Sequence, residues 1–229
     1  MKLKIFPQEG LKLLACASML LDHIGAAFYP GLMWLRIIGR LAFPIYCFLL
    51  AQGATHTRNP ARYGIRLLIG AALAELPFDF LFSGRLDLQY QNVMLTLLLG
   101  FLALQTMIKC TPLLLKLLVV LPFAVAAELL RTDYGGMGVL MIAMFALTEQ
   151  LPWQGVIRTF CLLLICANIP TAHMMLGSLR VSVQLFAVAA MVPIALYSSR
   201  KLTRSRALQT AFYLFYPVHL LALYLLRCL

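Results

Sequence analysis

The sequence has 229 residues, of which 62% are hydrophobic and only 12% charged, and its mean hydropathy is +0.90. This composition lies outside the range of soluble globular domains and predicts a membrane protein with several transmembrane helices. The net charge of +11 does not point to nucleic acid, because no basic stretch outside the apolar runs is long enough for a binding module, so we expect lipid and no nucleic acid as a partner.

Apolar runs bounded by charges, Pro and Gly predict about nine transmembrane helices in an all-α bundle that forms a single domain, residues 1–229. The runs lie near residues 11–29, 35–55, 64–82, 92–109, 112–130, 136–151, 155–170, 179–197 and 210–227. The larger share of the 19 Lys and Arg falls on the side of the N-terminus, which predicts a cytoplasmic N-terminus. Between residues 130 and 180 a re-entrant segment could replace a full crossing.

The first run carries an ionisable pair, Asp22 and His23, deep inside apolar sequence. An ionisable residue inside a membrane span marks a functional site by default. Lys12 lies eleven residues before His23, which in a helix is about 16 Å along the axis and ~20° from a whole number of turns. Neighbouring helical residues point about 100° apart. We therefore expect Asp22 to bind an arginine and His23 to face a cavity, or to be a satisfied interior hydrogen-bonding residue.

The second and third runs carry charges of opposite sign at the same spacing. Arg36 and Arg40 are four residues apart, as are Glu75 and Asp79, so each pair lies on one helical face and repels itself. We expect the two runs to pack through these pairs, with Asp22 close enough to join. The charges could simply lock the bundle, or they could shape a polar cavity, and Arg36 could also extend to water from its place near the run end.

The last run holds Tyr216, Pro217 and His219, and the proline predicts a kink that leaves carbonyl groups to be satisfied near the histidine. His219 lies at mid-depth like His23, so the two imidazoles could line one cavity. Packing is the alternative role for the aromatic side chains. The four histidines are too dispersed to indicate a metal site, and we expect none.

Several short motifs, distributed over nearly the whole chain, together resemble the TraX family. They are residues 19–25, 36–44, 53–58, 75–79, 92–97, 133–135 and 212–219. The namesake of that family is an inner-membrane protein of conjugative plasmids that N-acetylates pilin. The family in turn resembles the larger group of transmembrane acyltransferases, which use cytosolic acetyl-CoA. The resemblance implies a multi-pass protein of the bacterial inner membrane.

The resemblance also implies roles for individual residues. In the larger group a cation precedes an intramembrane histidine by the spacing of Lys12 and His23, and a paired-arginine motif resembles Arg62 and Arg66, whose spacing is one residue longer. The implied acyl donor is acetyl-CoA, with its phosphates bound by the cytoplasmic cations; these are Lys12, Arg58, Arg62 and Arg66.

The implied catalytic group is His23, as general base or acyl carrier, with Asp22 and Arg40 holding the first two runs in register. His219 or Tyr216 would support the acceptor or the developing oxyanion. The acceptor would be an amine or hydroxyl of a pilin-like protein, a glycan or a lipid. The competing interpretation is a non-enzymatic protein, either a carrier or flippase that uses the same charges as a relay, or a scaffold of the conjugation apparatus.

Overall fold

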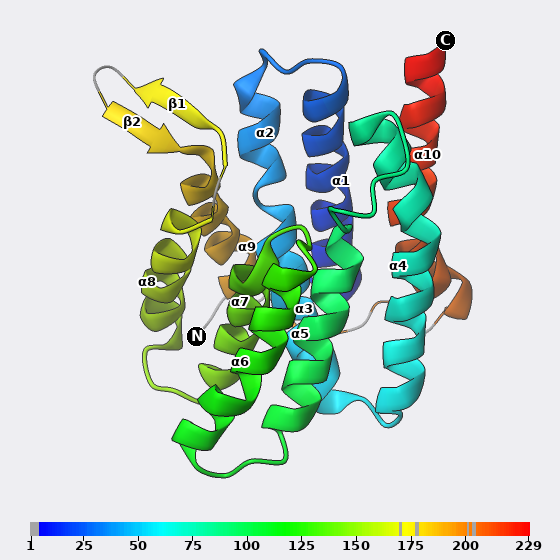
Figure 1. Ribbon diagram of the computed structural model, residues 1–229. Coiled ribbons are helices and arrows are strands. Elements are labelled where there is room, and N and C mark those ends of the chain that lie inside the picture. The colour runs from blue at the N-terminus through cyan, green and yellow to red at the C-terminus, as the bar shows by residue number, and fades with distance from the viewer. Residues whose placement is uncertain (1–4, 170, 177–178, 201, 203–204) are drawn as a thin grey trace. The chain divides into compact units, whose positions relative to one another are not determined.

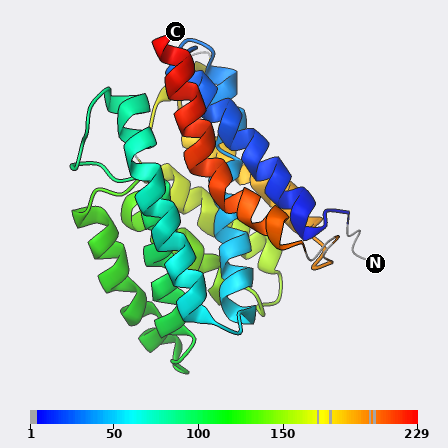
Figure 2. The ribbon, with the colours of Figure 1, turned by 90° about the vertical axis from the view of Figure 1, so that its right-hand side faces the viewer.

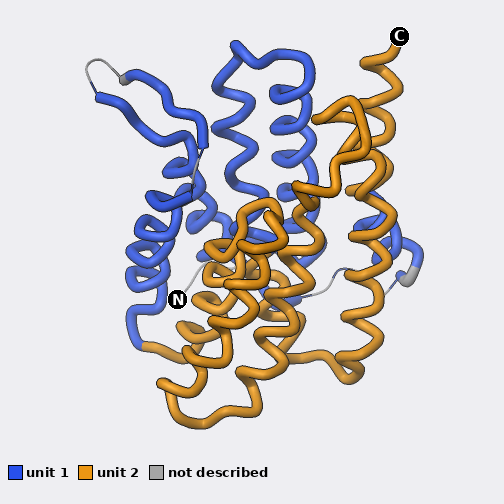
Figure 3. The backbone as a smooth tube through the Cα atoms, in the orientation of Figure 1, with its two compact units in different colours: residues 1–46, 152–215 blue, residues 47–151, 216–229 orange. Residues whose placement is uncertain are grey.

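The computed structural model describes residues 5–169, 171–176, 179–200, 202 and 205–229, and most of them are helical (Figure 1). They divide into two compact units (Figure 3). Unit 1 comprises residues 1–46 and 152–215, and unit 2 comprises residues 47–151 and 216–229. Helices α3 (Ala42–His56) and α10 (Arg206–Cys228) are each divided between the two units.

Unit 1 is built on two antiparallel helices that lie side by side, α1 (Gln8–Ala27) and α2 (Met33–Gly39) (Figure 1). Its later part contains α8 (Gln154–Ala167), a hairpin of β1 (His173–Leu176) and β2 (Leu179–Ser182), the 3-10 helix η1 (Val183–Ala190) and α9 (Met191–Ala195). η1 packs against both α2 and α8.

The contact between α1 and α2 depends on small residues and on the spacing of the buried positions in α1. The buried residues recur every three or four positions and so form one stripe; they include Leu11, Ala15, Ser18, Asp22 and Gly25. A Cβ at Gly25 would lie 2.8 Å from Cβ of Leu35, closer than two carbon atoms can pack. The two helix backbones therefore approach closely at the level of the buried aspartate.

Unit 2 is a bundle of α4 (Pro60–Ser83), α5 (Val93–Met107), α6 (Leu113–Leu129) and α7 (Gly135–Leu147), together with the second part of α10. α5, α6 and α7 pack against one another and α4 packs against α5, which Figure 2 shows from the side. α4 begins with an Asn59 side chain that accepts from the Arg62 N–H, and it ends at Gly84 in the left-handed region, with a φ of 68°.

Two of the predicted runs differ from the helices in the structure. Run 35–55 is interrupted, because α2 ends at Gly39 and α3 begins at Ala42. Run 179–197 is wrong as a single helix: its first residues form β2, paired antiparallel with β1, and Ser182 then caps a 3-10 helix by accepting from the Gln184 N–H. The prediction of an all-α chain was therefore wrong at this hairpin. The apolar character of the run concealed the change in backbone periodicity.

Three helices among the described residues are long and apolar enough to cross a membrane: Gln8–Ala27, Met33–His56 and Ala207–Cys228. α4 is equally long but carries four charged residues. One face of α4 nevertheless exposes large apolar side chains at helical spacing, each more than half exposed; they are Ile65, Leu68, Ile69, Leu73 and Leu76. Such a stripe is typical of a helix surrounded by lipid, and it indicates membrane association. The number of crossings and the side of the N-terminus stay predictions.

Candidate functional site

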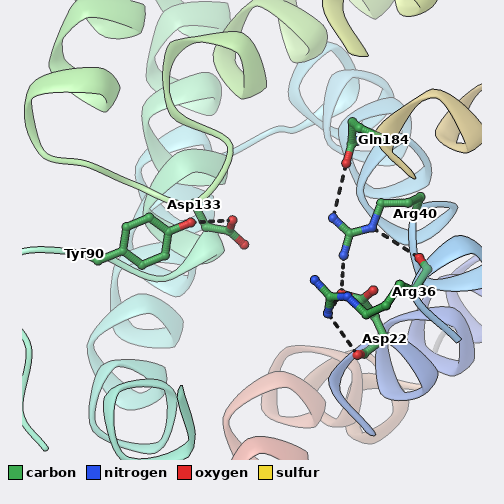
Figure 4. Close-up of polar contacts among 6 residues, drawn as sticks. All are labelled: Asp22, Arg36, Arg40, Tyr90, Asp133 and Gln184. Carbon is green, nitrogen blue, oxygen red and sulfur yellow. Dashed lines mark hydrogen bonds and ion pairs between the residues drawn. The ribbon is translucent and has the colours of Figure 1, made fainter. Parts of the chain in front are cut away.

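Unit 1 contains a buried ion-pair cluster formed by Asp22, Arg36 and Arg40 (Figure 4). Arg40 Nη2 lies 2.5 Å from Asp22 Oδ2, and Arg36 Nη1 lies 3.1 Å from the same oxygen. Arg36 Nη1 also donates to the Asp22 carbonyl at 3.1 Å. Asp22 and Arg40 are each 8% exposed. The prediction that Asp22 is the partner of an arginine is confirmed, and the pairing holds α1 and α2 in register.

Glycine at position 39 allows the cluster to form. A Cβ at Gly39 would overlap the side chain of Asp22, so the aspartate lies directly against the α2 backbone. The two arginines, which repel each other at this spacing, both pair with one carboxylate oxygen, which offsets their repulsion and leaves the three groups with one net positive charge. A buried carboxylate without cationic partners would be strongly unfavourable, so this arrangement explains how the charge is tolerated inside apolar helices.

Gln184 extends the cluster, and sequence reasoning missed it. This residue lies in η1 with 0% exposure, and its Oε1 accepts from Arg40 Nη1 at 3.2 Å (Figure 4). One signal could have identified it: Gln184 is a lone amide inside the apolar run 179–197, and a buried amide needs a hydrogen-bond partner. Its partner, an arginine 144 positions earlier, could not be read from the sequence.

His23 follows Asp22 in α1 and is half-buried. Lys12 lies on the same helix, also half-buried, with its Nζ 5.2 Å from the centroid of the Phe212 ring, which is within the range of a cation–π contact. Between them, Cys16 Sγ and the Tyr46 hydroxyl are 3.1 Å apart. α1 thus carries both members of the predicted cation and histidine pair in regular helix, at the spacing that the sequence predicts.

The carboxylates of α4 are held differently. Asn92 donates to Glu75 through its side-chain amide and, at 3.4 Å, through its backbone N–H. Asp79 is 1% exposed and its Oδ2 accepts from the Asp87 N–H at 3.0 Å. These contacts all lie within unit 2. The predicted pairing of Glu75 and Asp79 with the arginines of unit 1 involves both units and stays a prediction.

His219 and Tyr216 are both buried in the second part of α10, with 6% and 4% exposure, and their ring centroids are 5.7 Å apart. The structure therefore brings these two predicted residues together.

Thr96 bridges segments of unit 2, because its hydroxyl forms hydrogen bonds with Thr132 Oγ1 at 2.9 Å and with the Asp133 carbonyl. Asp133 in turn accepts from the Tyr90 hydroxyl at 3.0 Å (Figure 4).

The predicted phosphate-binding arginines are gathered at the start of α4. Arg58, Arg62 and Arg66 are exposed, and the Arg66 guanidinium lies 5.6 Å from the centroid of the Tyr63 ring. The N-terminus of a helix carries a partial positive charge, so the arginines and the helix end attract anions together. This cationic surface fits phosphate groups by charge and by the bidentate geometry of guanidinium.

A hollow of about 320 Å³ in unit 2 lies between the ends of α4 and α10, lined by residues that include Phe80, Tyr224 and Arg227. Arg227 Nη1 donates to the Leu81 carbonyl at 2.6 Å, so its charge is bound to the helix end beside it. None of the predicted site residues lines this hollow. We therefore place the candidate site at the cluster of unit 1 and not here.

Comparison with known proteins agrees with the sequence motifs. A probable fimbrial assembly protein, FimC of serogroup H1, from Dichelobacter nodosus is 32% identical over 232 residues, which cover 94% of this chain and 93% of that protein. An uncharacterized protein of Rickettsia prowazekii (strain Madrid E) is 34% identical over 93 residues, or 41% of this chain and 34% of that protein. No solved structure matches. The model of the TraX protein family matches residues 7–227, and the chain therefore belongs to the TraX family.

Proposed function

We propose that this protein is a multi-pass acetyltransferase of the bacterial inner membrane, which moves an acetyl group from acetyl-CoA to an amine or hydroxyl. The acceptor would be a pilin-like protein, a glycan or a lipid. One observation carries the proposal: Asp22, held by two arginines, fixes the turn of α1 that presents His23, and Lys12 lies on the same helix. An ion-pair cluster that immobilises a histidine-bearing turn inside apolar helices fits a site that must be preorganised.

His23 is the proposed general base. Acetyl-CoA supplies an activated thioester when bound. A neutral imidazole takes the proton from the acceptor nitrogen or oxygen as that atom attacks the thioester carbonyl. The carbon–sulfur bond then breaks, and the imidazole returns the proton to the departing CoA thiolate. In an alternative route the His23 nitrogen first attacks the thioester, so that a bond from the acetyl carbon to the imidazole forms as the carbon–sulfur bond breaks; the acceptor then attacks the acetyl group and the bond to the imidazole breaks.

The exposed arginines at the start of α4 are the proposed binding site for the phosphates of acetyl-CoA. Three guanidinium groups and one helix N-terminus offer several hydrogen-bond donors to a polyanion. Lys12, near the first turn of α1, is the fourth proposed cation. The buried pair of His219 and Tyr216 is proposed to support the acceptor or the oxyanion, since both can donate hydrogen bonds inside an apolar environment.

The name of the Dichelobacter nodosus relative favours one class of acceptor and also one alternative. That protein is described as a probable fimbrial assembly protein, which supports a pilin-like substrate for this chain. The same description fits a non-enzymatic assembly factor whose buried charges only hold its helices together. A carrier or flippase would use the charges as a relay. Neither alternative requires turnover of acetyl-CoA.

A transfer assay tests the proposal. Purified protein in liposomes is incubated with acetyl-CoA that is labelled in the acetyl group. Membranes of cells that lack the protein supply the acceptor. Label should appear in a protein, glycan or lipid fraction, with release of CoA measured by chromatography. His23→Ala should reduce transfer by about 100-fold or more, the usual contribution of a general base. His56→Ala is the matched control, because His56 is exposed and bonded to the Gln52 carbonyl of its own helix. Equal transfer by His23→Ala and the unaltered protein would refute the role of His23.

A further inference from the structure

Gln184 is the residue through which η1 meets the ion-pair cluster of unit 1. The other buried residues of this helix are apolar; they are Val183, Ala187 and Ala190. A glutamine with 0% exposure is unfavourable unless its amide is hydrogen-bonded, so the contact with Arg40 gives a reason for this polar residue. Its Nε2 lies 4.0 Å from Cys166 Sγ, a weak contact that leaves the arginine as its main partner.

The guanidinium of Arg40 is fixed by three different acceptors. Nη2 lies 2.5 Å from Asp22 Oδ2, Nη1 lies 3.2 Å from Gln184 Oε1, and Nε lies 3.3 Å from the Arg36 carbonyl. A guanidinium is a rigid plane, so three contacts on three nitrogens determine where the plane lies and how it is turned. If the acceptor on Nη1 is removed, the plane can rotate about the remaining contacts, and the ion pair of Arg40 with Asp22 changes its geometry while Arg36 still binds the aspartate.

The backbone of Gln184 is fixed as well. Ser182 is the last residue of β2, and its Oγ accepts from the Gln184 N–H at 3.3 Å, where η1 begins. η1 packs against both α2 and α8. The amide oxygen is therefore presented to Arg40 from a constrained backbone, which is the arrangement expected of a residue that orients a neighbour.

From this geometry we propose that Gln184 is a positioning residue of the acetyl-transfer site. It orients Arg40, Arg40 orients Asp22, and Asp22 holds the turn of α1 that carries His23. The inference rests on the proposed function and deepens it, because it adds a third element, η1, to a site that the sequence predicts from the first runs of the chain. Gln184 itself does not touch the reacting atoms in this scheme.

Two substitutions test whether Gln184 orients Arg40 through its hydrogen bond or only fills space beside it. Gln184→Met has nearly the same size but cannot accept a hydrogen bond from Arg40, whereas Gln184→Glu keeps an acceptor at the same distance from the backbone. In the liposome assay, Gln184→Met should lower kcat by about 10-fold to 100-fold, the effect expected of a small displacement in an active site, with an unchanged KM for acetyl-CoA. Gln184→Glu should stay within about 3-fold of the unaltered protein.

A double mutant tests whether Gln184 acts through Asp22. Asp22→Asn combined with Gln184→Met should be no less active than Asp22→Asn alone, because Gln184 acts through the ion pair of Arg40 with Asp22, which the first change has already removed. Equal kcat for Gln184→Met and the unaltered protein would overturn the inference, as would fully additive losses in the double mutant. Should Gln184→Met fail to fold, as judged by far-UV circular dichroism, Gln184→Asn provides a shorter polar side chain that cannot reach Arg40, and it should lose activity likewise.

The two proposals fail in different ways. Absence of acetyl transfer by the unaltered protein, or full transfer by His23→Ala, would overturn the proposed function and with it this role for Gln184. Transfer that depends on His23 but not on Gln184 would leave the proposed function intact and overturn only the inference about η1. Transfer that falls with Gln184→Met and recovers with Gln184→Glu supports both.

Discussion

Both units bury polar side chains among apolar helices, but they satisfy them by different means. In unit 1 a carboxylate forms ion pairs with two guanidinium groups, with an amide at the edge of the cluster. In unit 2 the carboxylates of α4 accept hydrogen bonds from uncharged donors instead, as in the contacts of Glu75 with the Asn92 N–H and of Asp79 with the Asp87 N–H. The difference matters because a substitution in the cluster of unit 1 removes a counter-ion, whereas a substitution at Asn92 or Thr96 in unit 2 removes only an uncharged hydrogen-bond partner.

This comparison also bears on whether the buried charges of unit 1 serve stability or function. Hydrogen bonds between uncharged groups, such as that of Thr96 with Thr132, can join apolar helices without any ion pair. Unit 1 contains ion pairs beside a histidine, although an apolar contact of similar volume would often be as stable as a buried ion pair. The cost of keeping charges there is therefore better explained by function than by stability.

Removal of the shared carboxylate should have the largest effect on stability. Asp22→Ala leaves two arginines close together without their anion, and the free energy of unfolding should fall by about 3–5 kcal/mol. Denaturant titration in detergent micelles, followed by far-UV circular dichroism, measures the change. The double mutant Asp22→Ala with Arg40→Leu should lose much less than the sum of the two single losses, because the second change removes the charge that the first had stranded.

A loss below about 1 kcal/mol for Asp22→Ala would place this cluster with the weak surface ion pairs and would contradict the comparison between the units. Arg36 and Arg40 offer a second check. The Arg40 side chain is 9% exposed and that of Arg36 is 27% exposed, so Arg40→Ala should be more destabilising than Arg36→Ala.

A methyl group at position 39 should have the next largest effect. Gly39→Ala places a Cβ where the Asp22 side chain lies, so α1 and α2 must separate or the aspartate must move, and the free energy of unfolding should fall by about 1–3 kcal/mol. Gly31→Ala is the matched control, since a Cβ there meets no atom within 4 Å. Equal stability of the two variants in the same titration would mean that the close approach at Gly39 is not needed.

Much of the site in unit 1 could be predicted because its signals are local. An aspartate in the middle of a run long enough to cross a membrane requires a cation, and arginines four residues apart lie on one helical face. Those two rules were sufficient to pair Asp22 with an arginine of the second run. The spacing of Lys12 and His23 is likewise a property of one helix and needs no tertiary information.

The parts that could not be predicted depend on contacts distant in sequence or on backbone geometry. Gln184 is recognisable only through Arg40, far away in the chain, and Gly39 shows its importance only once Asp22 is placed against it. The hairpin β1–β2 lies in sequence whose hydrophobicity fits either a strand or a buried helix. The break between α2 and α3 after Gly39 could not be predicted either, because the apolar run continues through the break.

The smallest effect is expected from a neutral contact in unit 2. Thr96→Val keeps the shape of the side chain but removes the hydroxyl that is hydrogen-bonded with Thr132 and the Asp133 carbonyl, so the free energy of unfolding should fall by about 1 kcal/mol. Thr96→Ser keeps the hydroxyl and serves as the control in the same titration. A loss from Thr96→Val as large as that from Asp22→Ala would mean that neutral and ionic contacts contribute alike in this protein. The ion pairs of unit 1 would then need no functional explanation, since either kind of contact would hold the helices equally well.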